Sequence, residues 1–262
     1  MPFVELQICG AFHGLYREDG EQAFPRCYVI RVVTFDAAGT LIRLIKPPGT
    51  TYADSARSFG YNLDPDRLQA AFQVAWRSLA PPLETTGPRA DDDRGWWKEL
   101  VRMTMGQAGY RLGAFDAYFD RVYETFAQPG IWELFADVPD ILAELGRLKI
   151  RLGIISNFDR RLYTVLGHLG ILQAFENVII SSEIGASKPA PRIFLEAARR
   201  FQVDPAEILH IGDDVDLDEK GARAAGCKAF VVHHESNRIG TILGLFDTSR
   251  SIHPRRSEAR PR

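Results

Sequence analysis

The second half of the chain alternates short apolar runs with longer segments in which apolar residues recur every three or four positions. The short runs predict buried strands, and the periodic segments predict helices. The expected strands lie within 150–156, 176–182, 208–213 and 228–234, and the expected helices within 137–149, 158–170, 190–201 and 218–226. This alternation indicates an α/β fold, a Rossmann-like parallel sheet covered by helices on both faces.

A further strand and a purely helical section precede this alternation. The β-branched and aromatic run at 28–35 predicts a buried strand that leads into Asp36. From about 47 to 129 only helical patterns follow, within 52–60, 67–80, 96–110 and 115–126. We therefore expect an α/β core built from 27–47 and 132–247, interrupted by an all-helical cap at 48–131.

Two short features of the expected cap bear on its surface and interior. Residues 81–95 are polar and rich in chain-breaking residues, which is typical of a loop. Asp91, Asp92 and Asp93 are expected to be a solvated part of this loop. Trp96 and Trp97 then stand at adjacent positions and point in different directions on a helix. One is expected in the cap core, and the other can line a substrate pocket.

Composition and charge exclude several classes of protein. Of 262 residues, 45% are hydrophobic and 25% charged, as in an ordinary globular chain. The net charge of −2 argues against a globally basic nucleic-acid binder. No apolar stretch reaches the ~18 residues of a membrane span, so no membrane partner is expected. The three cysteines form no CxxC pair, which argues against a zinc site and fits a cytoplasmic location.

The two ends of the chain carry no strong pattern. Residues 1–26 lack a clear period and a basic leader, so we interpret them as an N-terminal extension rather than a signal peptide. Residues 248–262 contain five arginines and no apolar run, and are expected to be a disordered basic tail. Nothing in the sequence favours a particular oligomeric state.

Polar residues stand near the end of each expected core strand. Asp36 follows the first strand, Ser156 and Asn157 end the second, Lys188 lies beyond the third, and Asp213 ends the fourth. The carboxyl ends of parallel strands meet at one edge of a sheet, where ligands bind. An acid, a hydroxyl, an amine and a second acid should therefore share one cleft.

This set of side chains suits phosphoryl transfer. A carboxylate such as Asp36 can attack phosphorus and form an aspartyl-phosphate. Ser156 and Asn157 can donate hydrogen bonds to the phosphoryl oxygens, while Lys188 can neutralise the developing charge. Asp36 and Asp213 together can hold Mg²⁺ through carboxylate oxygens. The sequence thus predicts a phosphate site with a metal beside it.

A tight turn is expected directly after Asp36. Gly39 and Thr40 allow a turn whose backbone N–H groups can face an anion. We therefore expect both residues to contribute to phosphate binding.

The four motifs resemble, in order, those of the haloacid dehalogenase superfamily, whose members are mostly phosphatases. The matching residues are Asp36, Thr40 and Leu41 in the first motif, Ser156 in the second, Lys188 and Pro189 in the third, and Gly212, Asp213 and Asp218 in the fourth. The segments TYADSARSFGYNLDPDRLQAAFQVAWRSL, WWKELV and ISNFDRRLYTVLGHLGI are similar to a narrower group, haloacid dehalogenase-like hydrolase domain-containing protein 3 and the rhythmically expressed gene products.

The resemblance implies a Mg²⁺-dependent phosphatase that acts on a small phosphorylated molecule. It implies that Asp36 is the nucleophile and that a helical cap is inserted between the first and second motifs. The implied metal ligands are Asp36, the backbone carbonyl of Ala38 and Asp213, with Asp218 positioning ligands or waters. The cap would exclude water and select the substrate.

One position departs from the family pattern. The second aspartate of the first motif, the family's general acid and base, is replaced by Ala38. Losing such a group lowers the rate by roughly 10²–10⁴-fold. We therefore expect slow turnover that favours good leaving groups. The metal site is less affected, because the family uses a backbone carbonyl at this position.

Three alternatives stay open beside the phosphatase. Ala38 also fits a non-catalytic module that binds phosphate and Mg²⁺. Residues 36–41 and 156–157 resemble those of 2-haloacid dehalogenases, although the acidic cluster at 213–218 argues against that class. Residues 36–40 also resemble phosphonoacetaldehyde hydrolases. Those enzymes need a lysine in the cap that forms a Schiff base, and the only lysine within this cap is Lys98. The motif that surrounds the lysine in those enzymes is not visible around Lys98.

Overall fold

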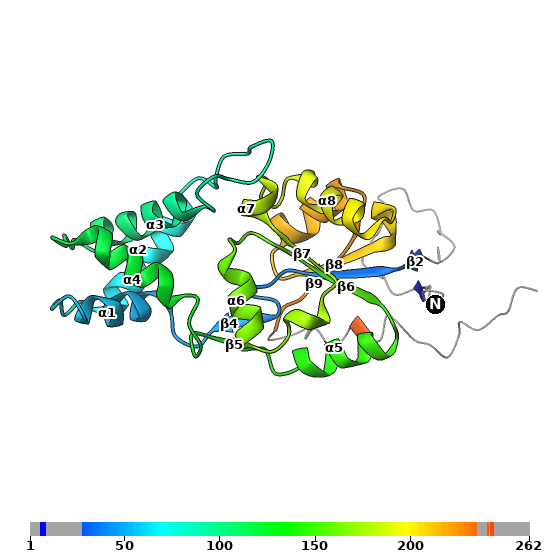
Figure 1. Ribbon diagram of the computed structural model, residues 1–262, viewed down its shortest axis with the longest axis horizontal. Helices are drawn as coiled ribbons and strands as arrows, with labels where there is room; N and C mark the ends of the chain where they lie inside the picture. Colours follow the sequence, from blue (N-terminus) through cyan, green and yellow to red (C-terminus); the bar gives the residue numbers. More distant parts are fainter. Residues whose placement is uncertain (1–5, 9–27, 235–239, 241, 244–262) are drawn as a thin grey trace, which may run out of the picture.

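The computed structural model describes residues 6–8, 28–234, 240 and 242–243. Its centre is a five-stranded parallel sheet with strand order β7-β6-β3-β8-β9 (Figure 1). The strands are β3 (Val32–Phe35), β6 (Arg151–Ser156), β7 (Asn177–Ile180), β8 (Ile208–Gly212) and β9 (Lys228–Val231). The parallel α/β fold predicted from the sequence is confirmed. Because β3 lies in the middle, the residues that follow it meet loops from both sides.

Helices cover both faces of the sheet (Figure 1). The longer elements are α5 (Val138–Arg147), α6 (Arg161–His168) and α8 (Pro191–Phe201), and the short ones are η1 (Leu172–Ala174), α7 (Ser181–Ile184), η2 (Pro205–Glu207), η3 (Val215–Lys220) and α9 (Gly221–Ala224). Phe35 and Ile154 pack with α5 and α6, whereas Val32 and Ile155 pack with α8 and α9. This division follows from the strand period of two, which sends neighbouring side chains to opposite faces.

The apolar run at 28–35 is two strands rather than the single strand predicted. β2 (Tyr28–Ile30) pairs with β1 (Leu6–Ile8) in a separate antiparallel sheet, and only β3 joins the main sheet. The break falls at Arg31, whose N–H donates to the carbonyl of Glu207 and whose guanidinium pairs with the Glu207 carboxylate. The predicted tail at 248–262, and all of 1–26 except 6–8, lie outside the described residues.

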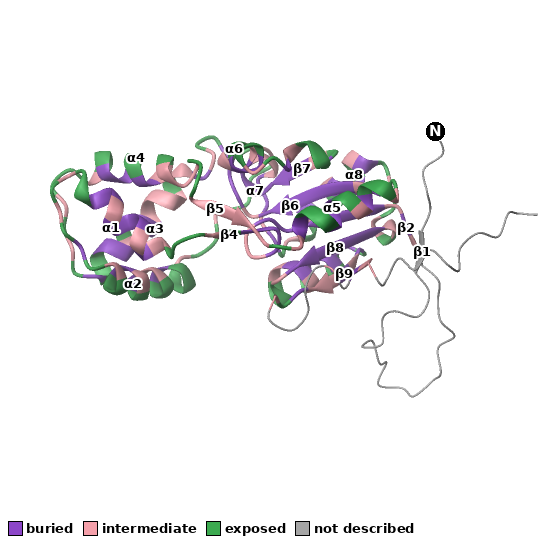
Figure 2. Ribbon diagram, turned by 90° about the horizontal axis from the view of Figure 1, so that it is seen from below, coloured by how far each residue is buried: buried purple, intermediate pink, exposed green. Residues whose placement is uncertain are grey.

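Four helices form a separate unit between two short strands, β4 (Ile42–Leu44) and β5 (Trp132–Leu134). They are α1 (Pro48–Arg57), α2 (Pro65–Ser78), α3 (Arg94–Gln107) and α4 (Phe115–Thr125). Their buried side chains, among them Tyr52, Leu68, Val101 and Phe119, form a cluster distinct from those of the sheet. The antiparallel β4–β5 ribbon links this unit to the sheet (Figure 2). We call α1–α4 and their connections the cap.

The helix predicted at 218–226 begins earlier than expected. Asp214 accepts hydrogen bonds from the N–H groups of Asp216 and Leu217, which starts the π-helical turn η3 at Val215. This early start carries Asp218 into a buried position, where 3% of its surface is exposed. Among the helices that the structure describes, none combines the length and apolarity needed to cross a membrane.

Candidate active site

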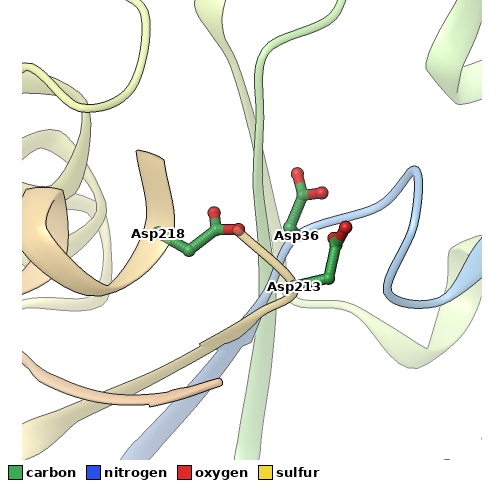
Figure 3. A group of neighbouring side chains, drawn as sticks. All are labelled: Asp36, Asp213 and Asp218. Atoms are coloured by element: carbon green, nitrogen blue, oxygen red, sulfur yellow. The ribbon is translucent and has the colours of Figure 1, made fainter. Parts of the chain in front are cut away.

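Side chains from separate segments meet at the carboxyl edge of the sheet (Figure 3). Asp36 directly follows β3, Asp213 directly follows β8, and Asp218 lies on η3. One carboxylate oxygen of each of these residues lies within 4.8 Å of the other two. Lys188, from the loop between α7 and α8, completes the group. The structure thus brings together the acids and the amine that the sequence placed in one cleft.

Lys188 lies between two of these acids. Its Nζ donates to Asp36 Oδ1 at 2.6 Å and to Asp218 Oδ1 at 2.5 Å, and only 3% of its side chain is exposed. Burial acts to lower the pKa of Lys188, but the two carboxylates outweigh it and raise the pKa. The residue is therefore a buried cation held by charge-assisted hydrogen bonds.

Burial also affects the three carboxyl groups. It is the main cause that raises the pKa of Asp36, against the opposing charge of Lys188. It likewise raises the pKa of Asp213, against the hydrogen bond from Thr40. For Asp218 burial is outweighed by Lys188 and His210, so its pKa is lowered. Three acids and one amine leave this edge with an excess of negative charge.

A buried histidine, His210, contacts the carboxylate of Asp218. The Nε2 atom of His210 lies 3.1 Å from Asp218 Oδ1, and its Nδ1 lies 3.0 Å from the hydroxyl of Thr34. Burial is the main cause that lowers the pKa of His210, which favours the neutral ring. A neutral ring that donates from Nε2 to the Asp218 carboxylate accepts at Nδ1 from the Thr34 hydroxyl. The sequence analysis did not select His210. Its signal is that it is the one ionisable residue inside the apolar strand β8.

The turn after Asp36 is held by its own hydrogen bonds. The N–H of Gly39 donates to the carbonyl of Ile42, and the N–H of Thr40 donates to that of Ala37. The prediction that these two groups face an anion is therefore not met in this arrangement. Instead, the Thr40 hydroxyl donates to Asp213 Oδ1 at 2.8 Å.

Gly39 itself is required by two features of the turn. Its φ of +99° is one that other residues rarely adopt. A Cβ at this position would lie 2.5 Å from Asp213 Oδ2. Gly39 thus lets the turn approach Asp213 closely, while its carbonyl accepts a hydrogen bond from His234 Nε2 at 2.9 Å.

Ser156 is the last residue of β6 and Asn157 follows it, and both line the same cavity as Asp36. The side-chain oxygen of Asn157 accepts from the N–H of Lys188 at 2.7 Å, and its amide nitrogen donates to the Lys188 carbonyl at 3.0 Å. Asn157 therefore fixes the backbone that carries the ammonium. Its predicted hydrogen bond to phosphate, and that of Ser156, stay predictions.

The charged edge opens into a cavity of about 330 Å³ between sheet and cap. Asp36, Ala38, Ser156 and Lys188 line one end of the cavity. Many of the remaining lining residues are aromatic residues of the cap. Trp97 is one of them, and Trp96 is not. Ala38 thus lies at the space in which a proton donor would act.

The loop between α2 and α3 ties the cap to the sheet beside Lys188. Arg89 is buried and donates to Asp93 at 2.9 Å and to the hydroxyl of Ser187 at 3.1 Å. The Ser182 hydroxyl donates to Asp92 at 2.6 Å. The aspartate run predicted to be solvated is therefore partly an interface, because Asp92 and Asp93 contact or support the core. No periodic pattern marks Arg89, so sequence analysis did not select it.

A divalent cation fits the charge of this edge. The carboxylates supply the hard oxygen ligands that Mg²⁺ prefers. Burial raises the pKa values of Asp36 and Asp213, so the anionic forms of both side chains are destabilised in the folded protein. A cation between them would offset this loss of solvation. Asp218 differs, because its two oxygens already accept from Lys188, His210 and the N–H of Asp214.

Fold and site together define an α/β protein with an inserted helical cap and an acid–lysine cluster at the edge of a parallel sheet. Residues 30–226 match the model of a protein family described as haloacid dehalogenase-like hydrolase. The chain therefore belongs to this family of hydrolases.

This chain is similar to the following three proteins, to the first two in sequence and to the third in fold. Human haloacid dehalogenase-like hydrolase domain-containing protein 3 is 36% identical over 205 residues, which cover 78% of this chain and 82% of the relative. Glyceraldehyde 3-phosphate phosphatase of Methanopyrus kandleri is 42% identical over 93 residues, 35% of this chain and 40% of the relative. The magnesium-bound HAD-hydrolase YfnB of Bacillus subtilis shares the fold, with a TM-score of 0.62 at 19% identity, covering 83% and 98% of the two chains.

Proposed function

We propose that this protein is a Mg²⁺-dependent phosphatase that acts on small phosphorylated molecules through an aspartyl-phosphate on Asp36. The observation that carries the proposal is the buried contact between Lys188 Nζ and Asp36 Oδ1 at 2.6 Å, at the wall of a cavity and beside two further acids. A nucleophile, a cation and a metal-binding acid thus face one space. The phosphatase activity named for one relative is consistent with this chemistry.

In the first step Asp36 attacks the phosphorus of the substrate. Its Oδ1 accepts from Lys188, which leaves Oδ2 to form the new bond. The bond from phosphorus to the leaving oxygen breaks, and that oxygen departs with the electron pair. Lys188, Ser156 and the N–H of Asn157 stabilise the charge on the phosphoryl oxygens.

In the second step water attacks the phosphorus of the aspartyl-phosphate. The bond between phosphorus and the Asp36 oxygen breaks, and inorganic phosphate leaves with the oxygen of the water. Ala38 can neither protonate the leaving oxygen nor accept the proton of this water. The first step is therefore slow for substrates whose leaving group needs a proton. The second step is slow for every substrate, because the leaving group has already departed.

The residues suited to hold Mg²⁺ are Asp36, the carbonyl of Ala38 and Asp213. Asp218 serves as the residue that positions Lys188, because both of its oxygens already accept hydrogen bonds. The bound cation would neutralise charge between the carboxylates and the phosphoryl group. The cap, residues 48–131, would exclude water from the cavity during the reaction.

Hydrolysis of p-nitrophenyl phosphate, with and without Mg²⁺, tests the proposal. We expect wild-type activity that requires Mg²⁺ and falls to background in Asp36→Asn, since an amide is not a nucleophile. Asp116→Asn makes the same change on an exposed cap residue and should keep full activity. Equal activity in Asp36→Asn and wild type would exclude the aspartyl-phosphate.

The non-catalytic module is the second candidate, and Ala38 is the observation that favours it. It predicts no hydrolysis in the wild type, together with a rise in thermal midpoint when phosphate and Mg²⁺ are added. A dehalogenase would instead release halide from a 2-haloacid without metal. The acidic cluster of Asp36, Asp213 and Asp218 disfavours that outcome.

A further inference from the structure

The cavity wall opposite the charged edge is rich in aromatic residues, with aliphatic residues such as Pro48, Val101 and Val122 between them. Rings from all four cap helices or their ends line it, including Tyr52, Phe72, Trp76, Trp97, Phe119 and Phe126. The volume of about 330 Å³ lies at the lower end of the range typical of small-molecule sites. The space therefore suits one compact ring system attached to a phosphate.

The rings hold one another in place. Phe72 stacks on Trp76 with centroids 5.8 Å apart and planes at 26°. Tyr52 meets both Phe72 and Phe126 edge to face, at 89° and 82°. Such pairs have preferred geometries that restrict ring motion. The wall therefore presents pre-positioned flat faces beside a few aliphatic side chains, which favours a flat ligand.

Away from the charged edge, one charged side chain lines the cavity among the described residues, that of Arg161. Its guanidinium is paired with the fully buried carboxylate of Asp159, at 2.9 and 2.6 Å. It also donates to the carbonyl of Tyr123 and stacks on that ring, 3.5 Å from its centroid. Because its charge is already neutralised, the cap end of the cavity favours an uncharged group over a second anion.

A second, independent observation concerns the leaving group. Ala38 faces the same cavity and cannot protonate a departing oxygen. An aryl oxide leaves without a proton far more readily than an alkoxide, since phenols such as tyrosine have pKa values of about 10 and bulk water has one of about 15.7. The aromatic rings of the cavity wall and the absence of an acid at position 38 therefore both favour an aryl leaving group.

From these observations we infer that the substrates are phosphate monoesters of an uncharged aromatic alcohol of phenol type, with the aryl group held against the cap rings around Trp97. The inference rests on the proposed phosphatase function and names its substrate class. It assigns Trp97 to specificity, whereas its neighbour Trp96, whose ring centroid lies 4.9 Å from that of Trp97, does not line the cavity.

The test compares 2-naphthyl phosphate with phenyl phosphate, whose phenols have similar acidity. We expect kcat/KM to be about tenfold higher for the naphthyl ester, as burial of the additional ring predicts. Trp97→Leu should reduce this preference to within about twofold, and Trp96→Leu should keep it. Trp76→Leu changes a cavity residue that is 49% exposed, and gives a second variant whose folding is little affected.

Two further measurements separate this inference from the proposed function. Acetyl phosphate has a good leaving group and no ring, so its hydrolysis by wild type and not by Asp36→Asn tests the reaction alone. Titration with naphthyl- and phenylphosphonate, which cannot be hydrolysed, tests the cavity alone. Equal affinity for the two phosphonates, or equal loss of preference in Trp96→Leu and Trp97→Leu, overturns the aryl assignment. If wild type does not hydrolyse acetyl phosphate but still prefers naphthylphosphonate in a way that depends on Trp97, the proposed phosphatase reaction is wrong and the aryl-binding site is retained.

Discussion

The two ends of one cavity are built in different ways. At the sheet edge, charged side chains are fixed by hydrogen bonds, such as those from Lys188 to Asp36 and Asp218. At the cap end, rings such as Trp97 and Phe126 are fixed by packing against other rings and by the helices that carry them. Hydrogen bonds are directional, whereas packing tolerates exchange of similar volumes.

This difference assigns separate tasks to the two ends. A small displacement at the sheet edge breaks a contact on which the chemistry depends, as the close approach of Gly39 to Asp213 illustrates. A substitution in the cap changes which group fits while the reacting atoms stay in place. Under the proposed function, the sheet edge carries out the reaction and the cap selects the substrate.

The largest effect is expected from Ala38→Asp. Ala38 lines the cavity, so we expect a carboxyl group at this position to protonate a leaving oxygen and to activate water. We expect kcat for an alkyl phosphate to rise by about 10²–10⁴-fold. The rise should be smaller for phenyl phosphate, whose leaving group needs no proton. Steady-state kinetics with both substrates measure the difference.

The control is Ala38→Asn, which has nearly the same shape and carries no acid. It should leave the rate for alkyl phosphates unchanged or lower. A gain in Ala38→Asn equal to that in Ala38→Asp would show that size rather than proton transfer limits turnover, and would contradict the role given to this position.

The contrast between the two ends also explains what the sequence predicts and what it does not. Apolar strand patterns predict the parallel sheet, and in such a sheet each strand end lies at one edge, so Asp36, Lys188 and Asp213 can be grouped from their order along the chain. The break at Arg31 is not predictable in this way, because it depends on a contact with Glu207, far along the chain.

The cap shows the limit more clearly. Helical periodicity separates Trp96 from Trp97, but which of them faces the cavity depends on how α3 packs on its neighbours. The solvated loop expected at Asp91–Asp93 is instead partly an interface, since its contacts to Ser182 and Ser187 arise only when cap and sheet are assembled. Local patterns hold no information on such contacts between distant segments.

The second prediction concerns Arg89, which joins the two ends. Replacing it by methionine leaves the Asp93 carboxylate buried without its cation and removes the hydrogen bond to Ser187, next to Lys188. We expect the free energy of unfolding to fall by about 3–5 kcal/mol. Urea denaturation measures this change. Arg77→Met, the same substitution at an exposed position of α2, should cost less than about 0.5 kcal/mol. Equal midpoints for the two variants would show that Arg89 does not stabilise the junction.

The smallest effect is a pH dependence at the same junction. Burial raises the pKa of Asp93 from 3.8 to about 6, against the opposing charge of Arg89 and with minor contributions from Asp159 and Asp91. Between pH 4 and 6 the folded state keeps the Asp93 proton that the unfolded state has lost. Wild type therefore loses stability as pH rises through this range. Asp93→Asn abolishes the titration, and asparagine tolerates the positive φ of 60° at this position.

The stability of wild type relative to Asp93→Asn should accordingly fall by about 2–3 kcal/mol from pH 4 to pH 7. Unfolding in urea at several pH values gives both curves, and their difference removes the titration of all other groups that the two proteins share. A constant difference across this range would mean that Asp93 is ionised with an ordinary pKa. The junction between cap and sheet would then be open to solvent, and the cap would be less firmly placed over the charged edge than its contacts indicate.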